Sequence, residues 1–313
     1  MAGVSEDDTF GVHIITRKFQ RVVELRGIDG LRMEINQDLK QWHETKINVA
    51  VTGSAGAGKS TFINTILGLD EDTGKGAQTG AIETTWDIFA YTKRNRNVIF
   101  WDLPGIGTPK FPKESYVEKV KLKDYDFFIL ISKCRFTEND AWLAEEIQAI
   151  GKRYYFVRSY VDQDICNDRR AHPNSHDPEK HLEIIRKDCE INMEGHTHDK
   201  IYLIDSLGCE KYDFDSLVAA LTRDIEGMKA DVLVASLSSV TKGILEMKWR
   251  SLFRQIQTVA FQAGMMCTAE SAEKIIRDVL KQESKYYCEV FDIDDDTLRA
   301  DQELFSVSDL AAD

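Results

Sequence analysis

The segment GSAGAGKST, residues 53–61, constrains the fold of this chain more than any other feature. It follows an apolar run, INVAV, and precedes FINTILGL, whose spacing favours a helix. The segment matches G-x-x-x-x-G-K-[ST], in which glycines let successive backbone N–H groups turn toward a phosphate. The sequence therefore predicts a strand, a phosphate-binding loop and a helix, in that order.

The residues of this loop have separate expected roles. Lys59 would reach the β- and γ-phosphates of a nucleotide, and Ser60 would bind Mg²⁺. The helix that begins near Lys59 adds the positive end of its dipole. We expect nucleotide contacts from Gly53, Ala55, Gly56, Ala57, Gly58, Lys59, Ser60 and Thr61.

A second motif, NVIFWDLPGIG, covers residues 97–107. Asp102 ends an apolar strand and is expected to face the Mg²⁺, while the Gly105 amide is expected to contact the γ-phosphate. Ile106 stands where Ras-like enzymes carry the Gln that orients the attacking water. We therefore expect an isolated subunit to hydrolyse a nucleotide slowly.

The segment between these motifs, GAQTGAIETTWDIFAY, offers three threonines. A GTPase switch needs a Thr hydroxyl that binds Mg²⁺ only while the γ-phosphate is present. Thr85 is the first choice, with Thr84 and Thr79 as alternatives. At least two of the three are then ordinary strand-edge threonines.

The segment YYFVRSYVDQD, residues 154–164, occupies the position where guanine is usually read by [NT]-K-x-D. Asp162 can accept hydrogen bonds from guanine that adenine does not offer; the alternative is that it caps a helix. Tyr160 replaces the usual Lys, and its ring could stack on guanine for about 1–3 kcal/mol. Ser206 or Leu207 could offer an amide to the guanine O6 atom.

The order of apolar segments predicts the fold. Strands alternating with helical or polar segments indicate an α/β fold with a mostly parallel sheet, whose ligands bind at the carboxyl ends of the strands. The strand-like runs lie at 47–51, 86–91, 98–101, 127–131, 154–157 and 201–204.

The regions before and after these strands have helical spacing. The later region should form one or two amphipathic helices with a common apolar stripe, which contains Leu237, Val240, Ile244, Leu245, Leu252 and Ile256. We expect an N-terminal helical segment at 1–45, a nucleotide domain at 46–228, and a C-terminal helical segment at 229–313 that packs with the N-terminal helices.

The overall composition argues against several classes of protein. A formal net charge of -13 argues against a nucleic-acid partner, because phosphate backbones are bound by surplus Lys and Arg. Six cysteines without a C-x-x-C pair suit reduced thiols. The start, MAGVSEDDTF, has no apolar core of a secretory signal. We therefore expect a protein of the cytoplasm, or of a membrane that faces it.

Taken together, these motifs resemble those of the immunity-related GTPases, an interferon-inducible family of intracellular defence. The resemblance is carried by GAGKSTFINTILGL, TGAIETT, FWDLPGIGTPKFP, YDFFILISKCRFTENDAWLAEEI, YYFVRSYVDQD and YDFDSLVAAL. It continues more loosely into LVASLSSV and YYCEVFDIDDDTL.

The resemblance implies a Ras-like P-loop GTPase domain joined to a helical domain built from both ends of the chain. It also implies GTP and GDP as ligands, with Mg²⁺, and GTP hydrolysis stimulated by self-assembly through the nucleotide face. Lys59 matches the hydrolytic subgroup of the family, and Glu83 lies at the position that assists activation across the dimer; otherwise Glu83 is a solvated side chain. Gly80, in TGAIETT, joins Thr79 among the expected nucleotide contacts.

The resemblance further implies related GTPases as partners and peripheral association with endomembranes or pathogen-containing vacuoles. Two features depart from the family. Its usual Thr-Lys-Val-Asp is Ser-Tyr-Val-Asp here, and its members typically continue beyond the position of Asp313 through further helices, one of them implicated in membrane contact.

The expected function is therefore a GTPase whose nucleotide state controls self-assembly and action on intracellular membranes. The first alternative is a nucleotide-binding regulatory partner that hardly hydrolyses GTP and docks to active relatives. A third, an ATP-using P-loop enzyme, requires that Asp162 play no part in base selection.

Overall fold

Two compact units make up the chain of the computed structural model. The helical unit comprises Met1–Thr45, Gly227–Ala235 and Gly243–Asp313, and the sheet unit comprises Lys46–Glu226 and Ser236–Lys242. The predicted domain boundaries stay a prediction, because a division into compact units does not show that each unit folds independently. The structure describes residues 20–31, 33–35, 37, 40–41, 44–72, 74, 76–79, 87–93, 97–108, 110–133, 136–193, 201–225, 228–266 and 272–293.

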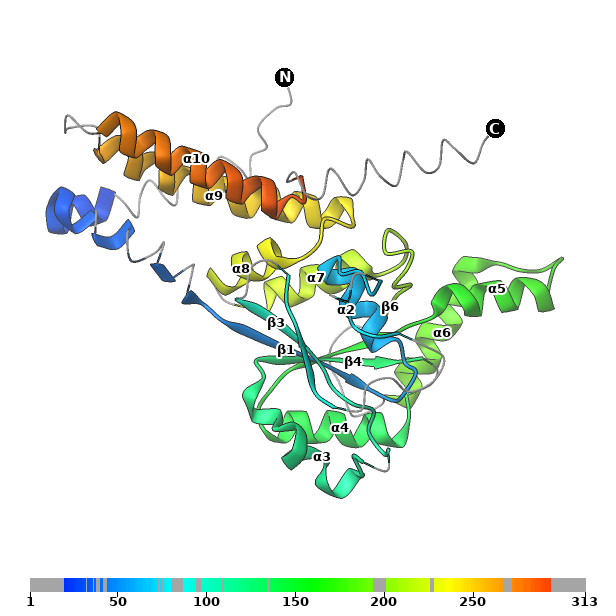
Figure 1. Ribbon diagram of the computed structural model, residues 1–313. Coiled ribbons are helices and arrows are strands. Elements are labelled where there is room, and N and C mark those ends of the chain that lie inside the picture. The colour runs from blue at the N-terminus through cyan, green and yellow to red at the C-terminus, as the bar shows by residue number, and fades with distance from the viewer. Residues whose placement is uncertain are drawn as a thin grey trace. The chain divides into compact units, whose positions relative to one another are not determined.

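A six-stranded sheet forms the centre of the sheet unit, in the order β2-β3-β1-β4-β5-β6 (Figure 1). Strand β2 runs antiparallel to β3, and the other neighbouring pairs are parallel. The predicted α/β fold with a mostly parallel sheet is confirmed, and each predicted apolar run overlaps a strand. The strands are β1 (Ile47–Gly53), β2 (Phe89–Tyr91), β3 (Val98–Asp102), β4 (Phe127–Ser132), β5 (Tyr154–Arg158) and β6 (Tyr202–Leu203).

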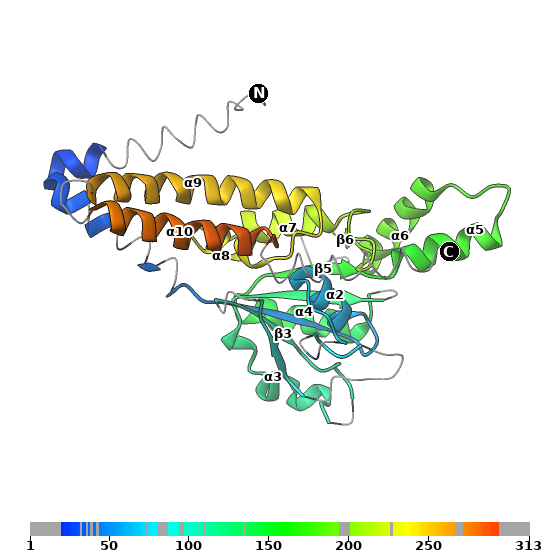
Figure 2. The same ribbon diagram turned by 45° about the horizontal axis from the view of Figure 1, so that its top comes forward.

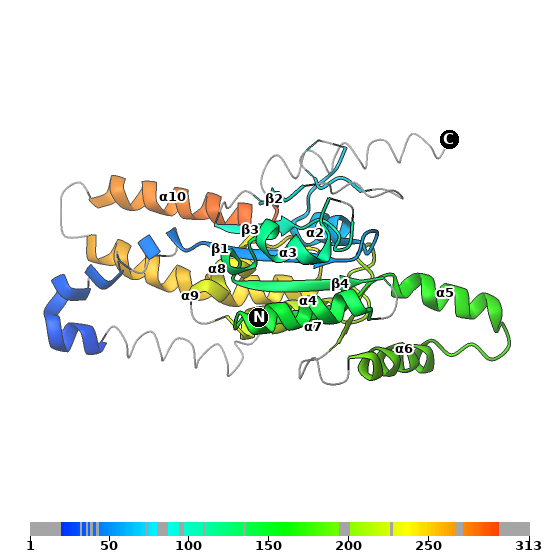
Figure 3. The same ribbon diagram turned by 90° about the horizontal axis from the view of Figure 1, so that it is seen from below.

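Helices cover both faces of this sheet, as parallel strands require. Helices α3 and α4 lie on one face, and α2 and α7 lie on the other (Figures 1 and 3). Helices α5 and α6 lie side by side beyond the sheet (Figure 2). The helices are α2 (Lys59–Leu67), α3 (Lys113–Val120), a 3-10 turn η1 (Leu122–Asp124), α4 (Glu138–Ala149), α5 (Val161–Ala171), α6 (Pro178–Asn192) and α7 (Phe214–Arg223).

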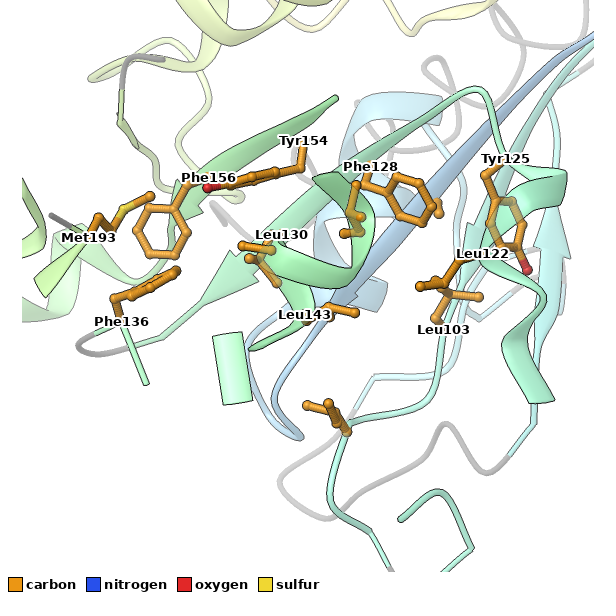
Figure 4. Close-up of a cluster of buried hydrophobic side chains, with 14 of the residues drawn as sticks. Leu103, Leu122, Tyr125, Phe128, Leu130, Phe136, Leu143, Tyr154, Phe156 and Met193 are labelled. Carbon is orange, nitrogen blue, oxygen red and sulfur yellow. The ribbon is translucent and has the colours of Figure 1, made fainter. Parts of the chain in front are cut away.

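The core under α3 and α4 follows from the alternation of side chains along the strands. Phe128 of β4 and Phe156 of β5 point to this face, and the Phe156 ring meets Phe136 edge to face with centroids 5.2 Å apart (Figure 4). On the opposite face, Phe62 of α2 packs against Phe214 of α7, with centroids 6.0 Å apart. All six residues of β4 are buried, because both faces of this central strand are covered.

The described part of the helical unit contains helical residues 20–31 and 33–35, with α8 (Met228–Ser236), α9 (Lys242–Met266) and α10 (Ala272–Val290). Leu237 and Val240 precede α9 in a non-helical segment, so their predicted place on the common stripe is wrong. On α9 itself, Ile244 and Leu252 are buried, whereas Leu245 and Ile256 are 38% and 42% exposed.

Lys248 of α9 is fully buried and donates a hydrogen bond to the Val290 carbonyl, 2.5 Å away, at the end of α10. This lysine therefore satisfies one of the carbonyls that every helix leaves unpaired at its C-terminus. Across the described residues, no helix has both the length and the apolar character needed to cross a bilayer.

Tyr116 of α3 generates a stability prediction. Its hydroxyl donates to the Pro104 carbonyl at 3.0 Å and lies 2.9 Å from the Thr52 hydroxyl, in a fully buried position. Tyr116→Phe leaves both partners buried without this bond, so we expect the free energy of unfolding to fall by about 1–2 kcal/mol. Urea unfolding measures this change, with Tyr91→Phe as the control, because Tyr91 is a half-buried residue on the edge strand β2. Equal values for the two variants would contradict the prediction.

Candidate functional site

The predicted site residues that follow β1, β3 and β5 gather at the carboxyl edge of the sheet, because these strands are parallel. Register pairs Gly53 of β1 with Ile131 of β4, and Ser132 of β4 with Arg158 of β5. Asp102 of β3 pairs with Val51 of β1. The loops after β1, β3, β4 and β5 therefore start from the same edge, which is where open α/β sheets bind ligands.

The loop after β1 has a backbone that only glycine allows at its first turn. Gly53 has a φ of 136°, and a Cβ there would lie 2.0 Å from the Ile131 carbonyl oxygen. Lys59, at the start of α2, folds back so that its Nζ donates to the carbonyls of Gly53 at 3.3 Å and Ser54 at 3.0 Å. Lys59 is 6% exposed. Its ammonium group is therefore held at the predicted phosphate-binding loop.

Ser60 and Asp102 are brought together, as the sequence predicted. The Ser60 hydroxyl donates to Asp102 Oδ2 at 2.6 Å, which joins the start of α2 to the end of β3. Both side chains are buried, with Asp102 only 1% exposed. A hydroxyl and a carboxylate at this spacing form a pair of hard oxygen ligands.

The turn after Asp102 packs directly on the phosphate loop. A Cβ on Gly105 would lie 2.8 Å from the Ala55 backbone nitrogen, so a larger residue would displace the loop. The next residue, Ile106, is 5% exposed and belongs to the hydrophobic cluster under α3 and α4. Its side chain therefore packs in the core.

Ser159 connects this loop to the loop after β5. Its hydroxyl lies 2.7 Å from the Ala57 carbonyl and 3.2 Å from the Ser132 carbonyl, and donates toward both. Its backbone N–H also donates to Ser132 at 2.9 Å. Ser159 occupies the first position of [NT]-K-x-D, and a hydroxyl at that position was the available signal for this role, which the sequence motifs did not predict.

Arg158 is a second connection that the sequence did not reveal. Its guanidinium donates to the carbonyls of Lys133 and Ser159 and forms an ion pair with Asp164 of α5. The side chain is 8% exposed. It therefore holds the ends of β4 and β5 and the first turns of α5 in one arrangement.

The predicted base-binding residues flank the start of α5. Tyr160 is half-buried with a φ of 56°, and Asp162 is exposed in the first turn. Burial, and then the charges of Asp162 and Asp205, raise the pKa of Tyr212. Asp162 therefore lies within electrostatic reach of the loop after β6, where the other predicted base contacts lie.

The loop after β6 holds Ser206 and Leu207. The Ser206 carbonyl accepts a hydrogen bond from the Thr65 hydroxyl at 2.7 Å, which ties this loop to α2. The Leu207 amide donates to Asp205 Oδ1 at 2.9 Å, and its side chain is 85% exposed. The amide of Leu207 is thus engaged within its own turn, and the expected contact of either residue with guanine stays a prediction.

The predicted switch segment lies mostly outside the described residues, including Gly80, Glu83, Thr84 and Thr85. Thr79 is described, and both its hydroxyl and its amide donate to the carboxylate of Glu71. These bonds lower the pKa of Glu71. The structure therefore places the Thr79 hydroxyl on Glu71 and does not favour it as a ligand beside Ser60.

The buried carboxylate of Asp140 lies close enough to the phosphate loop for the charge of Lys59 to act on its pKa. Burial raises its pKa, although hydrogen bonds from Thr137 and the positive charge of Lys59 act in the opposite direction. Its carboxylate accepts from the Thr137 N–H at 3.0 Å, in a capping box at the start of α4. The sequence signal was the T-E-N-D spacing of that box.

A strand, a glycine loop and a helix, with a neighbouring strand's carboxylate bonded to the loop serine, define a P-loop α/β protein. The chain belongs to the interferon-inducible GTPase family, because the family's sequence model, described as Interferon-inducible GTPase (IIGP), matches residues 13–310. The resemblance inferred from the motifs is thereby confirmed.

Two mouse relatives show the extent of the similarity. Interferon-gamma-inducible GTPase 10 of Mus musculus is 37% identical over 84% of this chain and 64% of its own length. Interferon-inducible GTPase 1 of Mus musculus is 36% identical over 92% of this chain and 72% of its own length. The chain therefore spans roughly two thirds of the length of these relatives.

The similarity of this chain to solved structures is weak. The crystal structure of a variant of Aquifex aeolicus Era bound to GDP.AlF4- is 21% identical, covers 58% of each chain, and has a TM-score of 0.39. A TM-score this low adds nothing to the family assignment.

The Ser159 connection generates a second prediction. Ser159→Ala removes the donor to the Ala57 carbonyl, so we expect amide hydrogen exchange across residues 53–58 to become faster. The free energy of unfolding should fall by about 1 kcal/mol. Hydrogen exchange followed by mass spectrometry measures the first effect and urea unfolding the second.

Ser115→Ala is the matched control, because the buried Ser115 hydroxyl has no hydrogen-bond partner within the described residues. Unchanged exchange of the loop in Ser159→Ala, relative to this control, would show that the hydroxyl does not hold the loop.

Proposed function

We propose that this protein binds GTP and GDP together with Mg²⁺ and hydrolyses GTP to GDP and phosphate. The observation that carries the proposal is the 2.6 Å hydrogen bond between Ser60 and Asp102 beside the buried Lys59. These residues join the helix after the phosphate loop to the end of the adjacent strand. Lys59 would bind the β- and γ-phosphates, and amides of the loop between Gly53 and Thr61 would surround them.

The residues present fit a magnesium ion. Mg²⁺ is usually held by one or two protein oxygens together with substrate phosphates and water. Ser60 and Asp102 supply such oxygens, and elsewhere in the described chain no three His, Cys, Asp or Glu side chains form a metal site. When bound, the ion would neutralise charge on the β- and γ-phosphates.

Asp162 would select guanine. A carboxylate can accept hydrogen bonds from the guanine N1 and 2-amino groups, and adenine lacks that pair of donors. Its exposed position in the first turn of α5 leaves the carboxylate accessible to a base. The same position would serve helix capping, but the carboxylate lies beyond the cap residue, Tyr160.

Hydrolysis would require help from outside a single subunit. Ile106 has no hydrogen-bonding group and is packed in the core, so it cannot orient the attacking water. A second subunit facing the nucleotide would supply the missing polarisation, with Glu83 as the proposed contributor and Thr85 as the proposed switch ligand. Hydrolysis would then depend on self-assembly through the nucleotide face.

At the level of the cell, we place this GTPase in the cytoplasm, with peripheral association with endomembranes or pathogen-containing vacuoles. Its partners would be further copies of the chain and related GTPases, in cell-autonomous immune defence. Membership of the interferon-inducible GTPase family supports this proposal, and the acidic net charge of -13 argues against a nucleic-acid partner.

The buried position of Ile106 also favours a second candidate function. A protein that binds nucleotide, hardly hydrolyses it and docks to active relatives needs no group to orient water. The two candidates differ in whether turnover per subunit rises with concentration.

Replacing Asp162 tests base selection. Asp162→Ala should reduce the preference for GDP over ADP by about 100-fold or more, because a site built around base hydrogen bonds loses its discrimination without them. Calorimetric titration with both nucleotides gives the ratio. Gln163→Ala, exposed on the same turn, is the control and should keep the preference. An unchanged ratio in Asp162→Ala would favour the ATP-using alternative.

Turnover at increasing protein concentration tests hydrolysis. We expect phosphate release per subunit to be slow in dilute solution and to rise with concentration, because a group supplied in trans can accelerate phosphoryl transfer by about 10³–10⁵. Lys59→Ala, which removes the phosphate-binding charge, should abolish this release at every concentration. A near-zero rate independent of concentration in the unaltered protein would favour the regulatory binder.

A further inference from the structure

We propose that Lys133, at the end of β4, supplies the positive charge that the base-recognition motif lacks, and that it acts through the ring of Tyr160. The inference rests on the guanine-nucleotide binding proposed above. It assigns a specificity-determining role to a residue for which the sequence predicted none.

Lys133 is held next to the motif by backbone contacts. It follows Ser132, which is paired with Arg158 in the parallel register of β4 and β5. The Arg158 guanidinium then donates to the carbonyls of both Lys133 and Ser159. The turn that carries Lys133 and the turn that carries Tyr160 are therefore joined by a buried cation, and their relative position does not depend on the long lysine side chain.

Tyr160 lies between the phosphate loop and this lysine. A Cβ on Gly58 would be 3.3 Å from Tyr160 Cε2, so the edge of the ring packs against the loop glycine. The Lys133 ammonium lies over the same ring, 4.6 Å from its centroid. This distance is well inside the range of about 6 Å for a cation–π interaction. An ammonium over this ring thus stays beside the phosphate loop.

Tyr160 and Lys133 together would fill the two roles that a single lysine has in the usual motif. There, a lysine offers its apolar stem to the base and its charge to the neighbourhood of the phosphate loop. Here the Tyr160 ring is the apolar surface, and Lys133 brings the charge from the adjacent strand. Because Lys133 covers one face of the ring, that face is not open for the stacking on guanine predicted from the sequence. Guanine would meet the pair at the remaining face or edge.

A charge exchange between the two positions tests the proposal. GDP affinity is measured by calorimetry on Lys133→Ala, Lys133→Arg, Tyr160→Lys and the double variant that combines Lys133→Ala with Tyr160→Lys. We expect Lys133→Ala to bind about two- to fivefold more weakly, the range of a cation–π pair at an exposed site, because Lys133 is exposed, and Lys133→Arg to stay near the unaltered protein. Tyr160→Lys should also bind GDP more weakly, because the ammonium groups at positions 133 and 160 would then lie close together and repel each other. The double variant should regain affinity, since it restores the single lysine of the usual motif.

Lys123→Ala is the matched control, because Lys123 is an exposed lysine in η1, before the start of β4 and thus at the opposite edge of the sheet. Thermal melting of each variant establishes that it is folded. The proposal is overturned if Lys133→Ala binds GDP as well as Lys123→Ala does, or if the double variant is no better than Tyr160→Lys. If the unaltered protein fails to bind GDP at all, the proposed function itself is wrong, which is a different result from a failure of the variants.

Discussion

The hydrogen bond from the Ser159 hydroxyl to the Ala57 carbonyl joins two loops that the sheet alone would leave independent. One loop carries Lys59, and the other leads into the first turn of α5. Since a buried carbonyl without a partner is costly, this bond fixes the loops in one relative position. Arg158 reinforces the arrangement from the other side by holding the end of β4 to the end of β5. The proposed nucleotide contacts depend on this connection, because phosphate and base lie at opposite ends of one ligand.

Much of the fold and part of the site could be predicted, because their signals are local in sequence. Strands that are buried on both faces appear as continuous apolar runs, and β4 is a run of six buried residues. The phosphate loop needs contiguous residues, so its position and the adjacent strand and helix could be predicted from residues 53–61 alone. The pairing of Ser60 with Asp102 followed from parallel strands, whose carboxyl ends meet at one edge.

The remaining features depend on contacts between distant segments, and a pattern within one segment cannot reveal them. No spacing links Lys133 to Tyr160, because their contact arises from the register of β4 against β5. Thr79 was a reasonable switch candidate by composition, yet its hydroxyl bonds to Glu71, which no motif marked. Ile256 repeats at helical spacing and is nevertheless exposed, because periodicity identifies a stripe without saying how much of it is covered.

The electrostatic potential at the phosphate loop depends on the nearest charged groups more than on the net charge of the whole chain. A net charge of -13 would repel an anionic nucleotide if it acted uniformly. Interactions between exposed charges are screened over about 8 Å at physiological ionic strength, so the groups nearest the loop decide the local potential. Lys59 is buried against the loop carbonyls, and Lys133 is held over a ring that touches Gly58. A lysine can therefore be lost from the base motif without loss of local positive charge, provided that a neighbouring strand returns one to the same place.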